Sequence, residues 1–279
     1  MTRSADQASD VNPSAKNLLL SVLGELVLPA GGSIWTSTAI EALSFLGVSA
    51  PNARQALSRL QDDGLLTAER HGRRARWTLT DAGFALLHGG AERIYSFGER
   101  QNDWGRDWLV ILCSVPESER SKRHRYRSRL EFAGFGFLAP GVAVSPNVDA
   151  EPVARRILKD LELSDGATVL HSRTGSVEAD QRMLEGAWDL TALATGYDKF
   201  INRFGGAEPA GIPETVAVLI GLVDAWRQFP FVDPELPSEL LPPSWPGSAA
   251  GELFRCLRAE WSPIALDWFK SAEAGQSID

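Results

Sequence analysis

The sequence holds few cysteines and no long apolar run. Its 279 residues include two cysteines, Cys113 and Cys256, and neither has a second Cys or His at a metal-ligand spacing. Both lie in apolar surroundings, so we expect free thiols and a reducing, cytoplasmic compartment. The longest apolar runs, such as 108–113, fall far below the ~18 residues of a membrane span. The polar segment 1–17 lacks the apolar core of a signal peptide.

Signatures of common enzymes are also missing. The chain has no GxSxG nucleophile elbow, no P-loop, no HExxH zinc motif and no GxGxxG in a βαβ context. Its four histidines are scattered along the chain. We therefore expect no catalytic residue, no metal and no cofactor.

The charge is unevenly distributed. Of 28 basic and 36 acidic residues, seven and fifteen lie from Asp180 onward, which leaves 21 of each in residues 1–179. Two basic islands lie in this neutral part. Residues 54–76 hold six arginines against three acids, and residues 120–129 hold five arginines and a lysine with no acid. A locally basic surface on an acidic chain is typical of a protein whose DNA contact is confined to one module.

The first hundred residues predict a winged helix-turn-helix domain over 16–98, after a disordered arm over 1–15. Apolar spacing and end signals predict helices over 16–28, 36–46 and 49–63. Alternation around Gly72 predicts a β-hairpin over 65–80, and a fourth helix follows to residue 97.

The rest of the chain predicts two further domains, and an α+β fold class overall. After a charged linker over 99–106, strands over 108–114 and 167–172, helices over 117–132 and 151–161 and a hairpin over 134–146 suit a ferredoxin-like domain over 99–180. The segment 181–279 predicts a helical domain for dimerisation or effector binding, with helices over 183–204, 213–229 and 248–271. A proline-rich stretch over 230–246 separates the last two helices.

The third predicted helix and the hairpin carry the strongest functional pattern. Apolar residues at 53, 56, 57 and 60 form a buried stripe, which turns Asn, Gln and Arg outward, the side chains that match base edges in the major groove. Arginines crowded at the hairpin tip favour phosphate or minor-groove contact. The alternatives are a solvated helix face, a solubilising loop and, for Thr36 and Ser37, plain helix caps. The predicted DNA-binding residues are Thr36, Ser37, Asn52, Arg54, Gln55, Ser58, Arg59, Arg73, Arg74 and Arg76.

The second basic island predicts an anion-binding helix. Arg120, Arg123 and Arg127 share one face of it. They could pair with the acidic C-terminal third, bind a phosphorylated ligand or make a second DNA contact. Aromatic residues of the C-terminal third could form a core or the wall of an effector pocket. The predicted effector-binding residues are Arg120, Arg123, Arg127, Trp188, Tyr197 and Trp226.

Three stretches of the sequence resemble the PaaX family of bacterial transcriptional repressors, and the resemblance covers about residues 16–270. The C-terminal stretch is the most specific of the three. The segments concerned are 54–60, 63–66 and 72–80; then 108–116, 120–130, 134–136, 140–142 and 145–146; and finally 233–237 and 240–247 with Ala250, preceded by Trp188, Tyr197, Phe200, Trp226 and Arg227.

The resemblance implies a homodimeric repressor that binds an inverted-repeat operator of a catabolic, aromatic-compound operon. A small aromatic acid or its CoA thioester would release the DNA, and phenylacetyl-coenzyme A is the inducer in the best-known branch. The central domain is similar to a nuclease subunit of CRISPR systems, but that activity is not carried over, because fold does not imply function.

Two further hypotheses stay open at the level of the sequence. One is an enzyme, such as a nuclease or transferase, that uses the winged helix only to dock on nucleic acid. The other is an adaptor whose winged helix binds protein. The arginines of the hairpin and the missing catalytic motifs favour the repressor.

Overall fold

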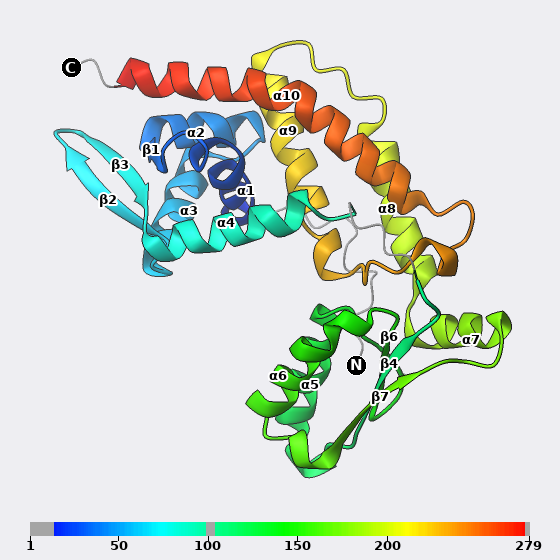
Figure 1. Ribbon diagram of the computed structural model, residues 1–279. Helices are drawn as coiled ribbons and strands as arrows, with labels where there is room; N and C mark the ends of the chain where they lie inside the picture. The colour runs from blue at the N-terminus through cyan, green and yellow to red at the C-terminus, as the bar shows by residue number, and fades with distance from the viewer. Residues whose placement is uncertain (1–13, 99–103, 277–279) are drawn as a thin grey trace. The chain divides into compact units, whose positions relative to one another are not determined.

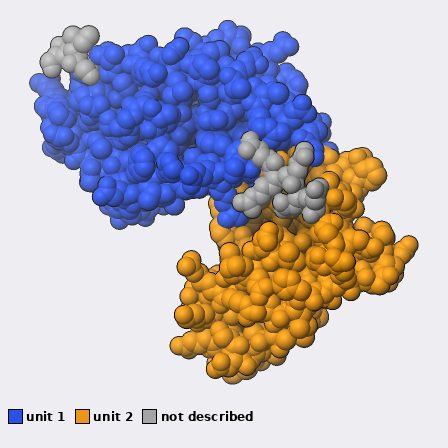
Figure 2. All heavy atoms as spheres, in the orientation of Figure 1, with its two compact units in different colours: residues 1–97, 198–228, 248–279 blue, residues 98–197, 229–247 orange. Residues whose placement is uncertain are grey.

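The computed structural model describes residues 14–98 and 104–276. It divides into two compact units, coloured separately in Figure 2. Unit 1 comprises residues 1–97, 198–228 and 248–279, and unit 2 comprises residues 98–197 and 229–247. The C-terminal helices are therefore shared between the units. The division into three sequential domains stays a prediction. Most of the predicted arm over 1–15 and part of the predicted linker over 99–106 lie outside the described residues.

Unit 1 begins with helices where the apolar spacing predicts them. Its N-terminal elements are α1 (Ala15–Val22), the π-helical turn η2 (Leu23–Val27), β1 (Ser33–Trp35), α2 (Thr36–Phe45), α3 (Ala50–Asp62), β2 (Leu66–His71), β3 (Arg74–Leu79) and α4 (Asp81–Tyr95). The predicted hairpin is confirmed, and Gly72 takes the positive φ (61°) that a two-residue hairpin loop requires at its first position. β1 was not predicted; it pairs antiparallel with β3 and gives a sheet of order β1-β3-β2.

The same unit contains α9 (Ile212–Trp226), residues 198–204 of α8 (Leu190–Phe204) and most of α10 (Pro246–Gln276). Its aromatic core is built around Trp226, whose ring stacks on Phe254 with centroids 4.7 Å apart and packs edge-on against Phe97. Trp226 is 1% exposed.

Unit 2 is an antiparallel sheet of order β5-β6-β4-β7 with two helices on one face (Figure 1). Its elements are β4 (Trp108–Cys113), α5 (Arg120–Phe132), β5 (Gly136–Ala139), β6 (Val142–Ser145), α6 (Glu151–Asp160), β7 (Ala167–Ser172) and α7 (Val177–Ala187). This is the β-α-β-β-α-β order of a ferredoxin-like unit. The whole chain is thus α+β with two antiparallel sheets.

The two faces of this sheet have separate cores, because successive strand residues point to opposite faces. Leu109 and Ile111 pack with Tyr126 of α5 and Ile157 of α6. On the other face, Trp108 packs with Leu184 of α7 and Trp188.

Three expectations need correction. The single helix predicted over 183–204 is two helices, α7 and α8, because Trp188 is extended and the Asp189 carboxylate accepts the backbone N–H of Ala192 (3.0 Å) at the start of α8. Helix α10 runs to Gln276, beyond the predicted residue 271. Cys256 is exposed rather than enclosed by apolar residues, whereas Cys113 is buried; both are free thiols.

None of the described helices is long and apolar enough to cross a membrane.

Candidate nucleic-acid interface

Helix α3 presents the polar face that its sequence predicts. Ala53, Ala56, Leu57 and Leu60 are at most 2% exposed and hold the helix against its neighbours. Every predicted contact residue of this helix is exposed: Asn52, Arg54, Gln55, Ser58 and Arg59. The buried stripe therefore fixes which side chains a ligand can reach.

A shallow polar depression of about 200 Å³ lies beside this face, between α3 and the start of α1. It is lined by Asn52, Gln55 and Arg59 together with Lys16. Lys16 forms an ion pair with Asp63 (2.5 Å). Lys16 is not among the predicted contact residues, because only the packing of α1 across α3 brings it to this face.

The hairpin arginines lie in three different environments. Arg73 is exposed in the loop. Arg74 is exposed but donates from Nη1 to the backbone carbonyl of Gln276 (2.6 Å). Arg76 is half-buried, and its guanidinium lies 5.6 Å from the ring centroid of Trp35. Only part of this predicted phosphate contact set thus points freely to solvent.

The start of α2 is tied to the hairpin. The hydroxyl of Thr36 donates to the Ala75 carbonyl (3.0 Å) and accepts from the indole N–H of Trp77 (2.9 Å). Ser37 is exposed. The alternative of helix caps is wrong for both residues, because Trp35 occupies the N-cap position of α2 and makes no side-chain capping bond.

Helix α5 forms its ion pairs locally. Arg123 donates to Glu117 (2.9 Å), Arg127 to Glu131 (2.7 Å) and Arg129 to Asp160 (2.6 Å). These partners all precede residue 180, so the alternative that this helix pairs with the acidic C-terminal third is wrong for these arginines. Arg123 holds the pKa of the Glu117 carboxyl below its ordinary value, chiefly by hydrogen bonding.

Within unit 2, the predicted effector-binding arginines and Trp188 lie on opposite faces of the sheet. The arginines of α5, including the exposed Arg120, lie on the helical side of the unit 2 sheet, and Trp188 packs on the opposite face. Trp226 belongs to the core of unit 1.

Tyr197 is enclosed in unit 2. Its ring stacks on Phe229 with centroids 4.2 Å apart, and its hydroxyl donates to Asp233 Oδ2 (2.5 Å). Burial raises the pKa of the Asp233 carboxyl, and burial and this carboxyl both raise the pKa of Tyr197. The hydroxyl is already satisfied, so in this state Tyr197 acts as a core residue.

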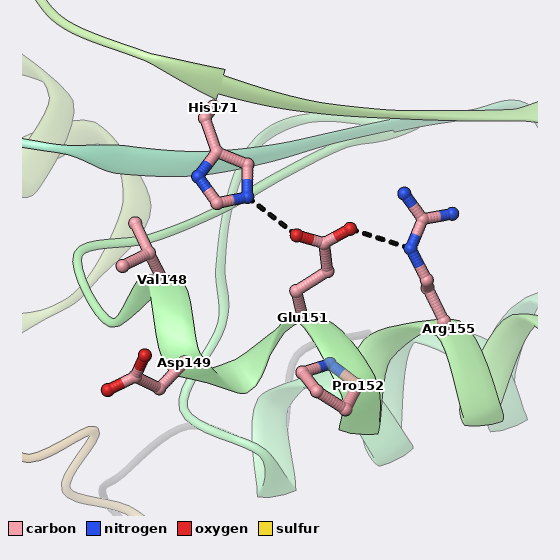
Figure 3. A pocket seen from close by; sticks show the side chains of 6 residues that line it. All are labelled: Val148, Asp149, Glu151, Pro152, Arg155 and His171. Carbon is pink, nitrogen blue, oxygen red and sulfur yellow. Dashed lines mark hydrogen bonds and ion pairs between the residues drawn. The ribbon is translucent and has the colours of Figure 1, made fainter.

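A second depression, of about 440 Å³, lies on unit 2 between the start of α6 and β7 (Figure 3). Glu151 lies between His171 and Arg155, with one carboxylate oxygen 2.6 Å from each side chain. Hydrogen bonds from His171 and then Arg155 lower the pKa of Glu151. Both carboxylate oxygens of Glu151 thus have a partner within the depression. Across the described ranges, no group of three or more His, Cys, Asp or Glu is placed to hold a metal ion.

Comparisons with known proteins match most of the chain. Residues 14–83 match the model of PaaX-like proteins, residues 101–184 the central Cas2-like domain of PaaX proteins, and residues 188–271 the PaaX-like C-terminal domain. The transcriptional repressor PaaX of Escherichia coli (strain K12) is 28% identical over 264 residues, which span 91% of this chain and 82% of that protein.

A solved structure shares the fold. The uncharacterized protein Rv0674 from Mycobacterium tuberculosis superposes with a TM-score of 0.64 at 22% identity, over 90% of this chain and 97% of that one. With three successive family models matched along its length, the chain belongs to the PaaX family.

Proposed function

We propose that this chain is a transcriptional repressor that binds double-stranded operator DNA through a winged helix-turn-helix. In this proposal α2 and α3 are the helix-turn-helix and the hairpin β2–β3 is the wing. The exposed face of α3, with its Asn, Gln and Arg side chains, is the observation that carries the proposal. The relationship to a named transcriptional repressor supports a regulator of transcription rather than an enzyme.

The division of roles follows from chemistry. Gln55 and Arg59 on α3 suit base edges, because their side chains can form two hydrogen bonds in one plane. Arg73 in the wing suits the phosphate backbone or the minor groove, because a guanidinium at a loop tip is drawn to negative potential. Phosphate contacts would position the module, and base contacts would specify the site.

The base-reading role is tested with Gln55→Ala and the matched control Gln61→Ala, another exposed glutamine of α3. Binding is measured by fluorescence anisotropy against a library of mutated operators. We expect Gln55→Ala to lose about 1–3 kcal/mol of discrimination at one position of each half-site. Unchanged discrimination at every position would contradict α3 as the base-reading helix.

The wing is tested through the salt dependence of binding. Arg73→Ala should weaken binding to all sequences alike and reduce the slope of log affinity against log salt by ~1. Arg182→Ala, at an exposed arginine on α7, is the control. If Arg73→Ala and the unmodified chain gave the same salt slope, the proposed contact between the wing and the phosphates would be contradicted.

The effector stays a prediction: a small aromatic acid or its CoA thioester that releases the operator of a catabolic operon. A thermal-shift screen with both ligand classes tests it, because a ligand of the native state raises the melting temperature. Arg123→Ala or Arg127→Ala should then abolish induction and leave operator affinity nearly intact. Retained induction with a lowered melting temperature would assign these arginines a structural role.

A further inference from the structure

The last turns of α10 lie against the elements that we assign to DNA contact. Glu273 Oε1 accepts the backbone N–H of Trp35 (3.0 Å), and the Gln276 carbonyl accepts from Arg74 Nη1 (2.6 Å). The ring of Trp268 packs against Phe45 of α2 with centroids 5.2 Å apart. Figure 1 shows this end of α10 beside β1 and α2, within unit 1.

The Glu273 carboxylate is negatively charged, and the Gln276 carbonyl carries a partial negative charge. The C-terminal end of a helix carries unsatisfied carbonyls and a partial negative charge, and Glu273 adds a full charge. Arg74 therefore binds an internal acceptor of the kind that a phosphate oxygen would supply. Through the Trp35 N–H, the Glu273 carboxylate also lies next to the start of α2, where Thr36 and Ser37 are predicted to meet phosphate.

The last turn of α10 is not anchored in the apolar core. Phe269 is the last fully buried residue of the helix, so the turn that carries Glu273 and Gln276 contributes no apolar side chain to the core. Releasing it breaks the hydrogen bonds to the Trp35 N–H and to Arg74, among its other contacts, and water or DNA can replace both partners. Upstream, the helix is held by Arg258 and Ser262, which both donate to the buried Glu25.

We propose that the C-terminal turn of α10 is an intramolecular competitor of DNA for the wing. In the free protein, the Gln276 carbonyl holds Arg74, and the Glu273 carboxylate on the Trp35 N–H repels phosphate. On binding, the DNA backbone displaces them. This inference rests on the proposed DNA binding through the wing. It means that the C-terminal turn of α10 lowers the affinity for DNA.

Removing the charge of Glu273 tests the competition. Glu273→Gln keeps an acceptor for the Trp35 N–H, and Glu273→Ala is the second variant, so that a folding defect in one does not decide the result. Affinity is measured for a mixed-sequence DNA duplex across a salt series. We expect about five-fold tighter binding at low salt, and a log–log salt slope steeper by up to ~0.9, because losing the carboxylate raises the net charge that faces the DNA by one.

The matched control is Glu260→Gln, at an exposed acid on the same helix. It should leave both affinity and slope unchanged. In an Arg74→Ala background the gain from Glu273→Gln should shrink toward zero, because the two residues act through one contact region.

The outcomes separate the two proposals. If the unmodified chain binds DNA with a steep salt slope but Glu273→Gln and Glu273→Ala bind no more tightly, the competitor is overturned and the proposed function stands. An equal gain from Glu260→Gln, or a full gain without Arg74, also overturns the competitor. If the unmodified chain shows no salt-dependent DNA binding, the proposed function fails and this inference fails with it.

Discussion

Asp180 shows what one buried carboxylate does for unit 2. It is 2% exposed and accepts hydrogen bonds from the Trp108 indole (2.8 Å), from Arg106 (2.7 Å) and from the Thr174 hydroxyl (2.6 Å). Burial alone would raise the pKa of this carboxyl. The hydrogen bonds from Thr174, Trp108 and Arg106 outweigh burial, so the pKa lies below its ordinary value.

Asp180→Ala should lower the free energy of unfolding of unit 2 by about 3 kcal/mol, because the Trp108 indole N–H is left buried without an acceptor. Urea denaturation measures this loss. Glu185→Ala, at an exposed acid of the same helix, is the control and should change little. A loss no larger than that of the control would contradict a structural role for Asp180.

The lowered pKa also fixes a pH dependence. The contribution of ionised Asp180 to stability is fully present above its ordinary pKa of about 3.9 and is lost as the pH falls through the lowered value. Acid should therefore destabilise Asp180→Ala less steeply than the unmodified chain in this range. If the free energy of unfolding fell equally steeply with decreasing pH in both proteins, this expectation would be contradicted.

At the scale of elements, the start of α4 is packed backbone to backbone against the base of the hairpin. The Thr80 hydroxyl accepts the Gly83 N–H (3.0 Å) and donates to the Gly64 carbonyl (2.7 Å). A Cβ on Gly83 would lie 2.1 Å from the Leu65 carbonyl oxygen. This glycine is needed for close approach of the helix to the hairpin.

Gly83→Ala should therefore cost about 2–3 kcal/mol of stability, although alanine is the better helix former. Gly89→Ala in the same helix is the matched control, because its added Cβ meets open space, and it should stabilise by up to ~1 kcal/mol. Thermal unfolding should show a lower melting temperature for Gly83→Ala and a higher one for Gly89→Ala. Equal changes in melting temperature would show that the helix can move away from Leu65.

At the scale of the whole molecule, the buried carboxylate of Glu25 joins distant segments of unit 1. Glu25 in η2 accepts from Arg258 (3.0 Å) and Ser262 on α10 and from the Tyr95 hydroxyl (2.5 Å) on α4. The guanidinium of Arg258 lies 3.8 Å from the Tyr95 ring centroid. Two segments far apart in the sequence, α4 and α10, are thereby fixed to one carboxylate of η2.

Arg258→Ala should destabilise unit 1 by about 3 kcal/mol, because it leaves Glu25 buried without its cation. Arg255→Ala, at an exposed arginine one turn earlier, should stay within about 0.5 kcal/mol of the unmodified chain. Chemical denaturation distinguishes the two. Similar midpoints for both variants would show that Tyr95 and Ser262 suffice to hold the carboxylate.

We also predict a homodimer, because a single winged helix reads few base pairs and two-fold symmetry doubles the site to match an inverted repeat. Light scattering should give twice the chain mass of 30.4 kDa, with or without residues 1–15. A mass of one chain at working concentration would contradict this prediction.

The polar face of α3 and the hairpin follow from the sequence, because both depend on local spacing. An apolar stripe at i, i+3, i+4 and i+7 leaves one possible outward set on a helix, and alternation around a glycine leaves one possible hairpin. The same local logic predicts the β-α-β-β-α-β order of unit 2. Family resemblance to PaaX repressors was also available from the sequence.

Partners distant in the sequence were decided only by the tertiary structure. Arg74 meets a carbonyl 202 residues away and Trp35 a carboxylate 238 residues away, and nothing in the spacing around either residue announces such a contact. The three-residue β1 is too short to show a period and forms because β3 offers it an edge. Within unit 2, α5 and Trp188 lie on opposite faces of the sheet for the same reason: packing, rather than local pattern, decides which surfaces meet.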